Sequence, residues 1–345
     1  MTTDKQAPTR PVPPYDSELA AALATWPEPP VSITQDLIPM RRAQPPIPPE
    51  EIIGDRPVVW ADRTIPGPDG APDLVATILQ RPDRKPGGPA VYYIHGGGMI
   101  FPDRWTGIPK VLDWITDLDA VMVSVEYRVA PEHPYPAPLD DCYAGLLWTA
   151  AQATELGYDP ARLAIAGASA GGGLTAGVTL RARDEHGPAL AAQVLIYPML
   201  DDRNETVSSY QFDGFGPWDR TSNDTGWDAY LGDRRRTADV PVYAAPGRAT
   251  DLSGLPPTFI DVGSAEVFRD EDVAYASQIW ADGGVCELHV WPGGFHGFDL
   301  SAPETALARA MIETRNAWLR RSLSVPPASP SPGPGPAGRA GPAPV

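Results

Sequence analysis

The sequence contains few cysteines and no long apolar run. Only Cys142 and Cys286 occur in 345 residues, too few for a disulfide framework, and they form no Cys-x-x-Cys metal pattern. No stretch reaches the ~18 consecutive apolar residues of a membrane-spanning helix, and residues 1–10 lack the apolar core of a signal peptide. We therefore expect a cytoplasmic protein with free thiols.

Positive charge is also scarce. The chain has 27 Lys and Arg against 44 Asp and Glu, which gives a net charge of −17. So acidic a surface repels phosphate backbones and anionic lipid headgroups. We therefore expect neither nucleic acid nor a membrane as a partner, whereas small neutral molecules remain open as substrates.

Proline is abundant, with 43 residues concentrated at the two ends of the chain. Residues 325–345 hold eight Pro and four Gly, a composition that cannot bury enough surface to fold, so we predict a disordered tail. Residues 1–50 have one short helical pattern around 17–26 and are predicted to form a docked arm or lid. The 42% of apolar residues is sufficient for a substantial core between these ends.

The central region alternates apolar runs with helical patterns, which predicts an α/β fold with a mostly parallel sheet. We expect eight strands, the first two antiparallel to the rest, and helices around 139–156, 171–185, 270–282 and 302–322. Residues 201–250 interrupt the alternation and are predicted to be a small helical insertion over the sheet's carboxyl edge. The expected strands are Val58–Arg63, Leu74–Gln80, Ala90–Ile94, Ala120–Glu126, Arg162–Ala166, Ala192–Tyr197, Thr258–Val262 and Cys286–Trp291.

Ser169 stands in the pentapeptide Gly167–Gly171, between a predicted strand and a predicted helix. In that context G-x-S-x-G is typical of a nucleophile elbow. Its glycines permit a turn too tight for a Cβ atom, and the free N–H groups at the helix start face a developing anion. A phosphate-binding helix start is the alternative, but we favour Ser169 as a catalytic nucleophile.

His95 and Gly96–Gly98 directly follow the apolar run Ala90–Ile94. Gly-rich loops at strand ends often bind phosphate, yet this loop has neither Walker spacing nor G-x-G-x-x-G. Such a loop can instead turn its N–H groups toward an oxyanion. We interpret His95 as a residue that braces the loop rather than as a base.

A nucleophilic serine needs a base, and a base needs a carboxylate that orients it. Of the five histidines, His296 alone lies in a flexible loop just after the last predicted strand, where it can reach Ser169. The carboxylate should follow the strand Thr258–Val262, and Glu266 lies in the turn there. The other candidates are Asp270, Glu271 and Asp272, at the start of the next helix. The chain order Ser169, Glu266, His296 is that of α/β-hydrolases.

Between about Val58 and Ser322 the sequence resembles the hormone-sensitive-lipase-like branch of the α/β-hydrolases, the bacterial HGGG esterases. The resemblance implies an α/β-hydrolase fold with a mostly parallel eight-stranded sheet, helices on both faces and a helical cap. It puts the family's nucleophile on Ser169, its base on His296, and its oxyanion donors on the N–H groups of Gly97, Gly98 and Ala170. The motifs that support it are His95–Gly98, Tyr127–Pro134, Gly167–Gly172 and Phe295–Phe298.

The chain departs from the family pattern at two positions. Ala168 precedes the nucleophile where the family usually has Asp, and Glu266 opens the run 266–270 where the family usually has Asp-Pro-Leu-Arg-Asp. Glu266 is therefore the family's acid by position. Glutamate is one methylene longer than aspartate but can still accept the imidazole N–H.

The resemblance implies a serine carboxylesterase that hydrolyses short- to medium-chain acyl esters through an acyl-enzyme. Its substrate would be a small-molecule ester, with no metal or cofactor. The arm 1–50 and the insertion 201–250 match the family's cap, around a catalytic domain at 51–324. The alternatives are a lactonase, thioesterase or amidase with the same triad, or a non-catalytic ligand receptor on this fold. A homodimer is possible as the oligomeric state.

Overall fold

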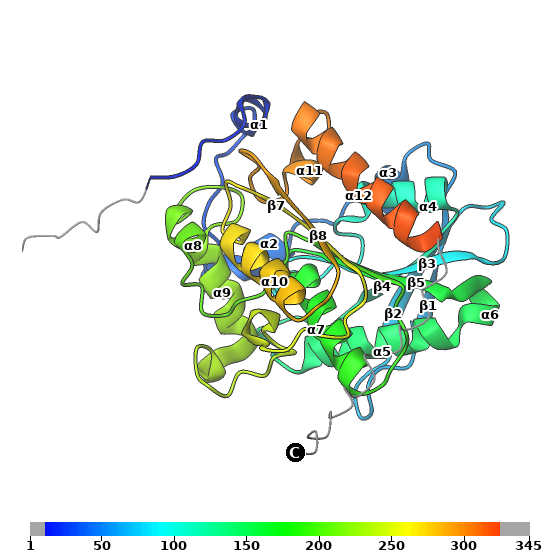
Figure 1. Ribbon diagram of the computed structural model, residues 1–345. Helices are drawn as coiled ribbons and strands as arrows, with labels where there is room; N and C mark the ends of the chain where they lie inside the picture. Colours follow the sequence, from blue (N-terminus) through cyan, green and yellow to red (C-terminus); the bar gives the residue numbers. More distant parts are fainter. Residues whose placement is uncertain (1–10, 325–345) are drawn as a thin grey trace, which may run out of the picture.

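The computed structural model of this chain describes residues 11–324. One mixed sheet lies between two layers of helices (Figure 1). The predicted disordered tail, 325–345, lies outside the described residues, as does the start of the predicted arm.

The sheet has eight strands in the order β1-β2-β4-β3-β5-β6-β7-β8. Its inner strands are buried along almost their whole length, which is why they appear in the sequence as continuous apolar runs. The eight strands are β1 Val59–Ile65, β2 Leu74–Gln80, β3 Gly88–Ile94, β4 Val121–Glu126, β5 Tyr158–Ala168, β6 Ala192–Ile196, β7 Thr258–Gly263 and β8 Cys286–Trp291.

The expectation that the first two strands both run antiparallel to the rest was wrong for one of them. β2 pairs antiparallel with β4, but β1 pairs antiparallel with β2. Two successive reversals bring β1 back to the direction of β3–β8. Only β2 is therefore antiparallel to the main sheet, because a tight turn must reverse the chain between β1 and β2.

Helices cover both faces of the sheet (Figure 1). α4 (Leu112–Leu118) and α12 (Ala306–Ser324) contact each other on one face. On the other face, α5 (Ala137–Ala151) packs beside α7 (Ala170–Asp184), while α10 (Arg269–Ala281) lies against β7 and β8. The predicted helix 139–156 is divided, because α5 ends at Ala151 and the short α6 (Ala153–Leu156) follows.

The insertion and the arm lie against each other over the sheet. The insertion contributes α8 (Val207–Gln211) and α9 (Arg220–Leu231), and the arm contributes α1 (Ser17–Leu23), α2 (Ile38–Arg42) and α3 (Pro49–Ile53). Hydrogen bonds join them: the Ser32 hydroxyl donates to Asp219 at 2.5 Å, the Ile33 N–H donates to the Ser222 hydroxyl at 2.8 Å, and the Gln211 amide donates to the Pro11 carbonyl. The two segments together are called the cap below.

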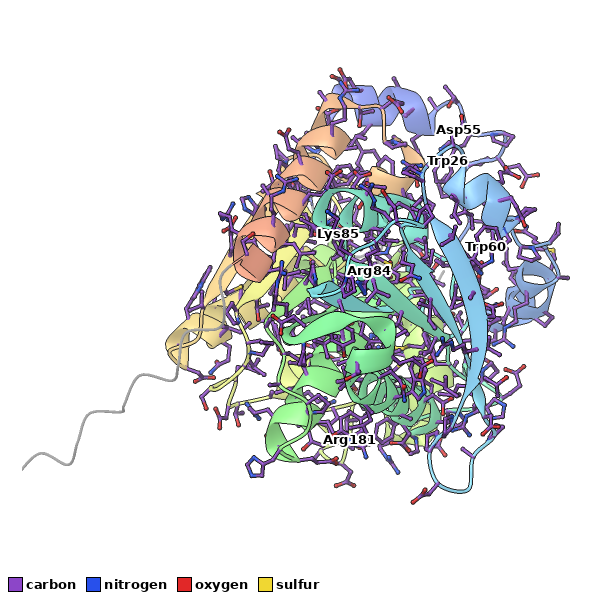
Figure 2. All side chains as sticks on the ribbon, turned by 90° about the vertical axis from the view of Figure 1, so that its right-hand side faces the viewer. Trp26, Asp55, Trp60, Arg84, Lys85 and Arg181 are labelled. Atoms are coloured by element: carbon purple, nitrogen blue, oxygen red, sulfur yellow. The ribbon has the colours of Figure 1, made fainter. Side chains whose placement is uncertain are left out.

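The arm continues past the edge strand of the sheet. Figure 2 shows Trp26 of the arm and Trp60 of β1 on the same side of the molecule. The Trp60 ring packs edge-on against Trp105, with centroids 5.9 Å apart. This contact links the edge strand to the segment that follows the Gly-rich loop. Within residues 11–324, no helix combines the length and the apolar character that crossing a bilayer requires.

Candidate active site

Ser169 lies on a sharp turn between β5 and α7. Its backbone has φ 57° and ψ −124°, a conformation that non-glycine residues rarely adopt. The Ser169 N–H donates a 2.8 Å hydrogen bond to the Ile196 carbonyl, at the end of β6, and this bond fixes the turn. A Cβ atom on Gly171 would lie 2.2 Å from the Ile94 carbonyl oxygen. Glycine is therefore required where the helix start crosses the neighbouring strand end.

The His296 ring lies between a hydroxyl and a carboxylate. Its Nε2 is 3.0 Å from the Ser169 Oγ, and its Nδ1 is 2.6 Å from a carboxylate oxygen of Glu266. An ionised carboxylate can only accept a hydrogen bond, so Nδ1 is the protonated nitrogen and Nε2 is free to accept the serine proton. The structure thus brings these three predicted residues together in one line.

Glu266 follows β7 and is buried, with 1% of its surface exposed. Its second oxygen accepts the Gly263 N–H at 2.9 Å, so the carboxylate is fixed by its own turn. Residues 269–281 are already helical, and their side chains are used elsewhere. Asp270 accepts the Ser208 N–H, and Glu271 accepts the N–H groups of Leu200 and Asp201.

Asp272 differs from the other acidic residues of this segment. Its side chain is fully buried, and within residues 11–324 neither carboxylate oxygen has a hydrogen-bond partner. Burial, followed by the negative charges of Glu271, Glu266 and Asp261, raises the pKa of Asp272 well above its usual value. Asp272 is therefore held as a neutral acid beneath the site.

The substitution Asp272→Asn is expected to stabilise the protein increasingly as the pH rises. A raised pKa means that the folded protein binds this proton more tightly than the unfolded chain does. Its contribution to stability is complete below the unfolded pKa, about 3.9, and is lost as the pH rises through the folded pKa, at about 1.4 kcal/mol per pH unit. Asparagine does not ionise and escapes this loss.

Thermal unfolding of the two proteins, followed from mildly acidic to alkaline buffers, measures the effect. The difference in Tm should widen with pH. Asp55→Asn is the matched control, because Asp55 is exposed on the surface (Figure 2), and its Tm difference should stay flat. Parallel curves for Asp272→Asn and wild type would show that the pKa of Asp272 is not raised in the folded protein.

The loop His95–Gly98 lies beside the serine. Gly97 and Gly98 have φ of 118° and 60°, which suits glycine and turns the backbone N–H groups out of the strand direction. Ala170 is the first residue of α7, so its N–H is one of the free donors of a helix start. These are the three predicted oxyanion donors.

His95 is fully buried. Its Nδ1 lies 2.8 Å from the Gly96 carbonyl oxygen, and its ring stacks on Tyr127 with centroids 4.1 Å apart. The Tyr127 hydroxyl donates to the His95 carbonyl at 2.9 Å. These contacts fit a residue that braces the loop.

Arg42 of the arm also holds the segment that follows the Gly-rich loop. Its guanidinium donates to the carbonyls of Ile100 and Ala130 and forms a 2.8 Å ion pair with Glu132. Arg42 therefore links the arm to the segment that follows the Gly-rich loop and to the segment 130–132.

Three aromatic residues lie near the site; the aromatic residues of the insertion, Trp218 among them, were expected to line the pocket, whereas Tyr15 and Tyr197 were not anticipated. Trp218, from the cap, covers Gly98: a Cβ there would lie 2.2 Å from the Trp218 Cη2 atom. Tyr15, from the arm, packs edge-on against Phe295, and burial, followed by the charge of Glu266, raises its pKa to about 12. Tyr197 packs edge-on against His296. No local pattern signals such long-range contacts.

Comparison with known proteins identifies relatives that share this fold and are named as esterases. A family model described as an alpha/beta hydrolase fold matches residues 91–300. Carboxylesterase NlhH of Mycobacterium tuberculosis is 39% identical over 242 residues, 69% of this chain and 74% of that protein. Carboxylic ester hydrolase LipN of the same organism is 36% identical over 272 residues, 75% of this chain and 70% of that protein. The solved structure of a bacterial heroin esterase superimposes with a TM-score of 0.83 at 38% identity, covering 90% of this chain and 98% of that one.

The fold and these relatives define a carboxylic ester hydrolase built on the α/β-hydrolase fold. The chain belongs to the hormone-sensitive-lipase-like branch of the α/β-hydrolase family. The fold class and the resemblance predicted from the sequence are thereby confirmed.

Proposed function

We propose that this protein is a serine carboxylesterase in which Ser169, His296 and Glu266 form the catalytic triad. The observation that supports this most strongly is the continuous line of hydrogen bonds, 3.0 Å from Ser169 to His296 and 2.6 Å from His296 to Glu266. This order of nucleophile, base and orienting carboxylate is what acyl transfer requires.

In the proposed reaction the Ser169 Oγ attacks the ester carbonyl carbon while His296 Nε2 takes the hydroxyl proton. The carbonyl oxygen becomes an oxyanion that accepts hydrogen bonds from Gly97, Gly98 and Ala170. The tetrahedral intermediate collapses to an acyl-serine, and His296 returns the proton to the departing alcohol. Water, deprotonated by His296, then attacks the acyl-serine; the acyl–Oγ bond breaks, the acid is released, and His296 returns the proton to the Ser169 Oγ. Glu266 keeps Nδ1 protonated and stabilises the imidazolium.

The alternatives differ in what the site must do. A lactonase, thioesterase or amidase would use the same three residues, so the shape of the pocket decides among them. A non-catalytic receptor does not need a base, whereas here His296 lies within hydrogen-bond distance of the serine. We therefore favour turnover over ligand binding alone.

A panel of aryl esters of increasing acyl length, with an aryl thioester, a lactone and an anilide, tests the proposal. We expect the largest kcat/KM for a short- to medium-chain aryl ester. Faster turnover of the thioester, lactone or anilide would reassign the reaction, and a folded protein that turns over none of them would favour the receptor.

The preference for shorter acyl chains rests on the cap. Trp218 lies over Gly98, one of the proposed oxyanion donors, and so bounds the space beside the reacting carbonyl. We also propose that the arm and the insertion 201–250 act together as this cap around the catalytic domain, with a small-molecule ester as the substrate and the cytoplasm as the location.

Trp218→Ala is expected to shift activity toward longer acyl chains. Removing the indole enlarges the pocket next to Gly98, and each methylene that gains a place in an apolar pocket contributes about 1 kcal/mol. The ratio of kcat/KM for a long-chain over a short-chain aryl ester should rise by on the order of tenfold.

Phe215→Ala is the matched control for Trp218→Ala. Phe215 belongs to the same insertion but is 38% exposed and packs against Phe212. Its chain-length profile should stay that of wild type. If Trp218→Ala leaves the profile unchanged as well, the cap does not limit the acyl chain.

A further inference from the structure

A group of buried charged side chains lies behind the ring of His296. We propose that Tyr197 is a positioning residue for His296, and that a buried network of hydrogen bonds around its hydroxyl fixes the distance between the serine and the base. The proposal rests on the proposed triad. The network consists of Lys110, Asp261, Asp299 and Arg315, at the centre of the fold.

Tyr197 touches the base directly. Its ring meets the His296 ring edge-on, with centroids 4.7 Å apart and planes inclined at 69°. Phe268 makes a second edge-on contact with the same imidazole at 5.1 Å. The imidazole is therefore held by two aromatic rings as well as by its two hydrogen bonds, and a movement of the Tyr197 ring would move it.

The hydroxyl of Tyr197 ties that ring to the network. It donates to Asp299 at 2.7 Å and accepts a hydrogen bond from the Lys110 ammonium. Asp299 lies three residues beyond His296, in the short helix α11 (Phe298–Ser301). The hydroxyl thus connects the strand end that holds Tyr197 with the loop that carries the base.

Arg315 of α12 closes the network. Its guanidinium pairs with Asp261 of β7 at 2.9 Å and with Asp299 at 3.1 Å. Tyr197, Asp261, Asp299 and Arg315 are each at most 2% exposed, and Lys110 is 7% exposed. Two basic side chains thus face two acidic ones, and burial, opposed by the charge of Arg315, raises the pKa of Asp261 to about 7.

Tyr197 also connects to the nucleophile. It follows Ile196, whose carbonyl accepts the Ser169 N–H. Its own N–H donates to the Asp261 carbonyl at 2.7 Å, and its φ is 36°, in the left-handed region that a tyrosine rarely adopts. The strained backbone at Tyr197 therefore places this residue next to both the turn that carries Ser169 and the ring of His296.

Stability alone does not account for such a network. Burying charged groups costs several kcal/mol of desolvation per ion, and well-packed apolar side chains of similar volume would stabilise the core as well or better. The polar groups contribute hydrogen bonds, which are directional. Each of these bonds fixes the position of one element relative to another. The network joins five segments of the chain to the Tyr197 ring, and that ring contacts His296.

Tyr197→Phe tests the proposal, because it keeps the ring but removes the hydroxyl that fixes it. We expect kcat for an aryl ester to fall by about tenfold to a hundredfold with KM nearly unchanged, as small misplacements of a catalytic group cost rate rather than binding. Lys110→Met removes the cation from the other side of the hydroxyl and should act in the same direction.

Tyr92→Phe is the matched control. Tyr92 is also fully buried, and its hydroxyl donates one 2.8 Å hydrogen bond to the Cys142 carbonyl, away from His296. It should lose stability but keep kcat within about twofold of wild type. The proposal is overturned if Tyr197→Phe keeps the kcat of wild type, or if Tyr92→Phe loses as much as Tyr197→Phe does.

A second readout separates this proposal from the proposed function. The proton between His296 and Glu266 can be followed by NMR as a downfield resonance, assigned by its loss in Glu266→Gln. In Tyr197→Phe it should shift or broaden, whereas in Tyr92→Phe it should not. This holds even if wild type hydrolyses none of the esters, a result that would overturn only the proposed function. An identical resonance in wild type and Tyr197→Phe would overturn the positioning role.

Discussion

Replacement of Ser169 with alanine is expected to lower kcat for aryl esters by on the order of 10⁴–10⁶. The variant removes the atom that would form the acyl-enzyme and leaves the oxyanion donors and the pocket in place. Steady-state hydrolysis of an aryl acetate, compared with the rate in buffer, measures the loss. The fold should be retained, because within residues 11–324 the Ser169 side chain makes no hydrogen bond other than that to His296.

Ser253→Ala is the control for this substitution. The Ser253 side chain is in an exposed turn, and its removal should leave kcat unchanged. A folded Ser169→Ala protein with near-normal activity would show that another group attacks the ester.

Replacement of Glu266 with glutamine should lower kcat by on the order of 10³–10⁴. Glutamine has the shape of glutamate but no charge to stabilise the imidazolium, and its amide can hold the wrong tautomer of His296. KM should change little, because the Glu266 carboxylate lies on the far side of the imidazole from Ser169. The ratio of kcat in the two proteins is the measurement.

Asp270→Asn is the matched control for Glu266→Gln. Asp270 is four residues further along, at the start of α10, and its carboxylate accepts the Ser208 N–H and pairs with Arg269. Its loss should cost far less than the loss of Glu266. The opposite result, with Asp270→Asn inactive and Glu266→Gln nearly normal, would move the role of the acid to Asp270.

The parts of the fold that follow from local pattern were predictable from the sequence. Buried parallel strands are continuous apolar runs, so all eight were located with small errors at their ends. The strand–turn–helix context of Ser169 and the glycines after β3 indicated where the nucleophile and oxyanion loop would lie. The direction of β1 was not predictable in the same way, because it depends on which neighbour pairs with it.

Contacts between distant segments could not be predicted. Lys110 and Asp299 meet on the Tyr197 hydroxyl although 189 positions separate them in the chain. Trp218 reaches Gly98 from an insertion whose sequence shows only an excess of aromatic residues. The burial of Asp272 could not be predicted either. An acidic residue in the first turn of a helix usually lies at the surface, where its charge interacts favourably with the helix dipole.

Identification of the residue that carries the acyl group tests the central claim most directly. The wild-type protein is mixed with an aryl acetate, quenched with acid before steady state, digested with trypsin and examined by mass spectrometry. The account predicts one acetyl group on Ser169, within the tryptic peptide 163–181, and none in Ser169→Ala. An acetyl group on a different residue, or equal labelling of Ser169→Ala, would contradict it.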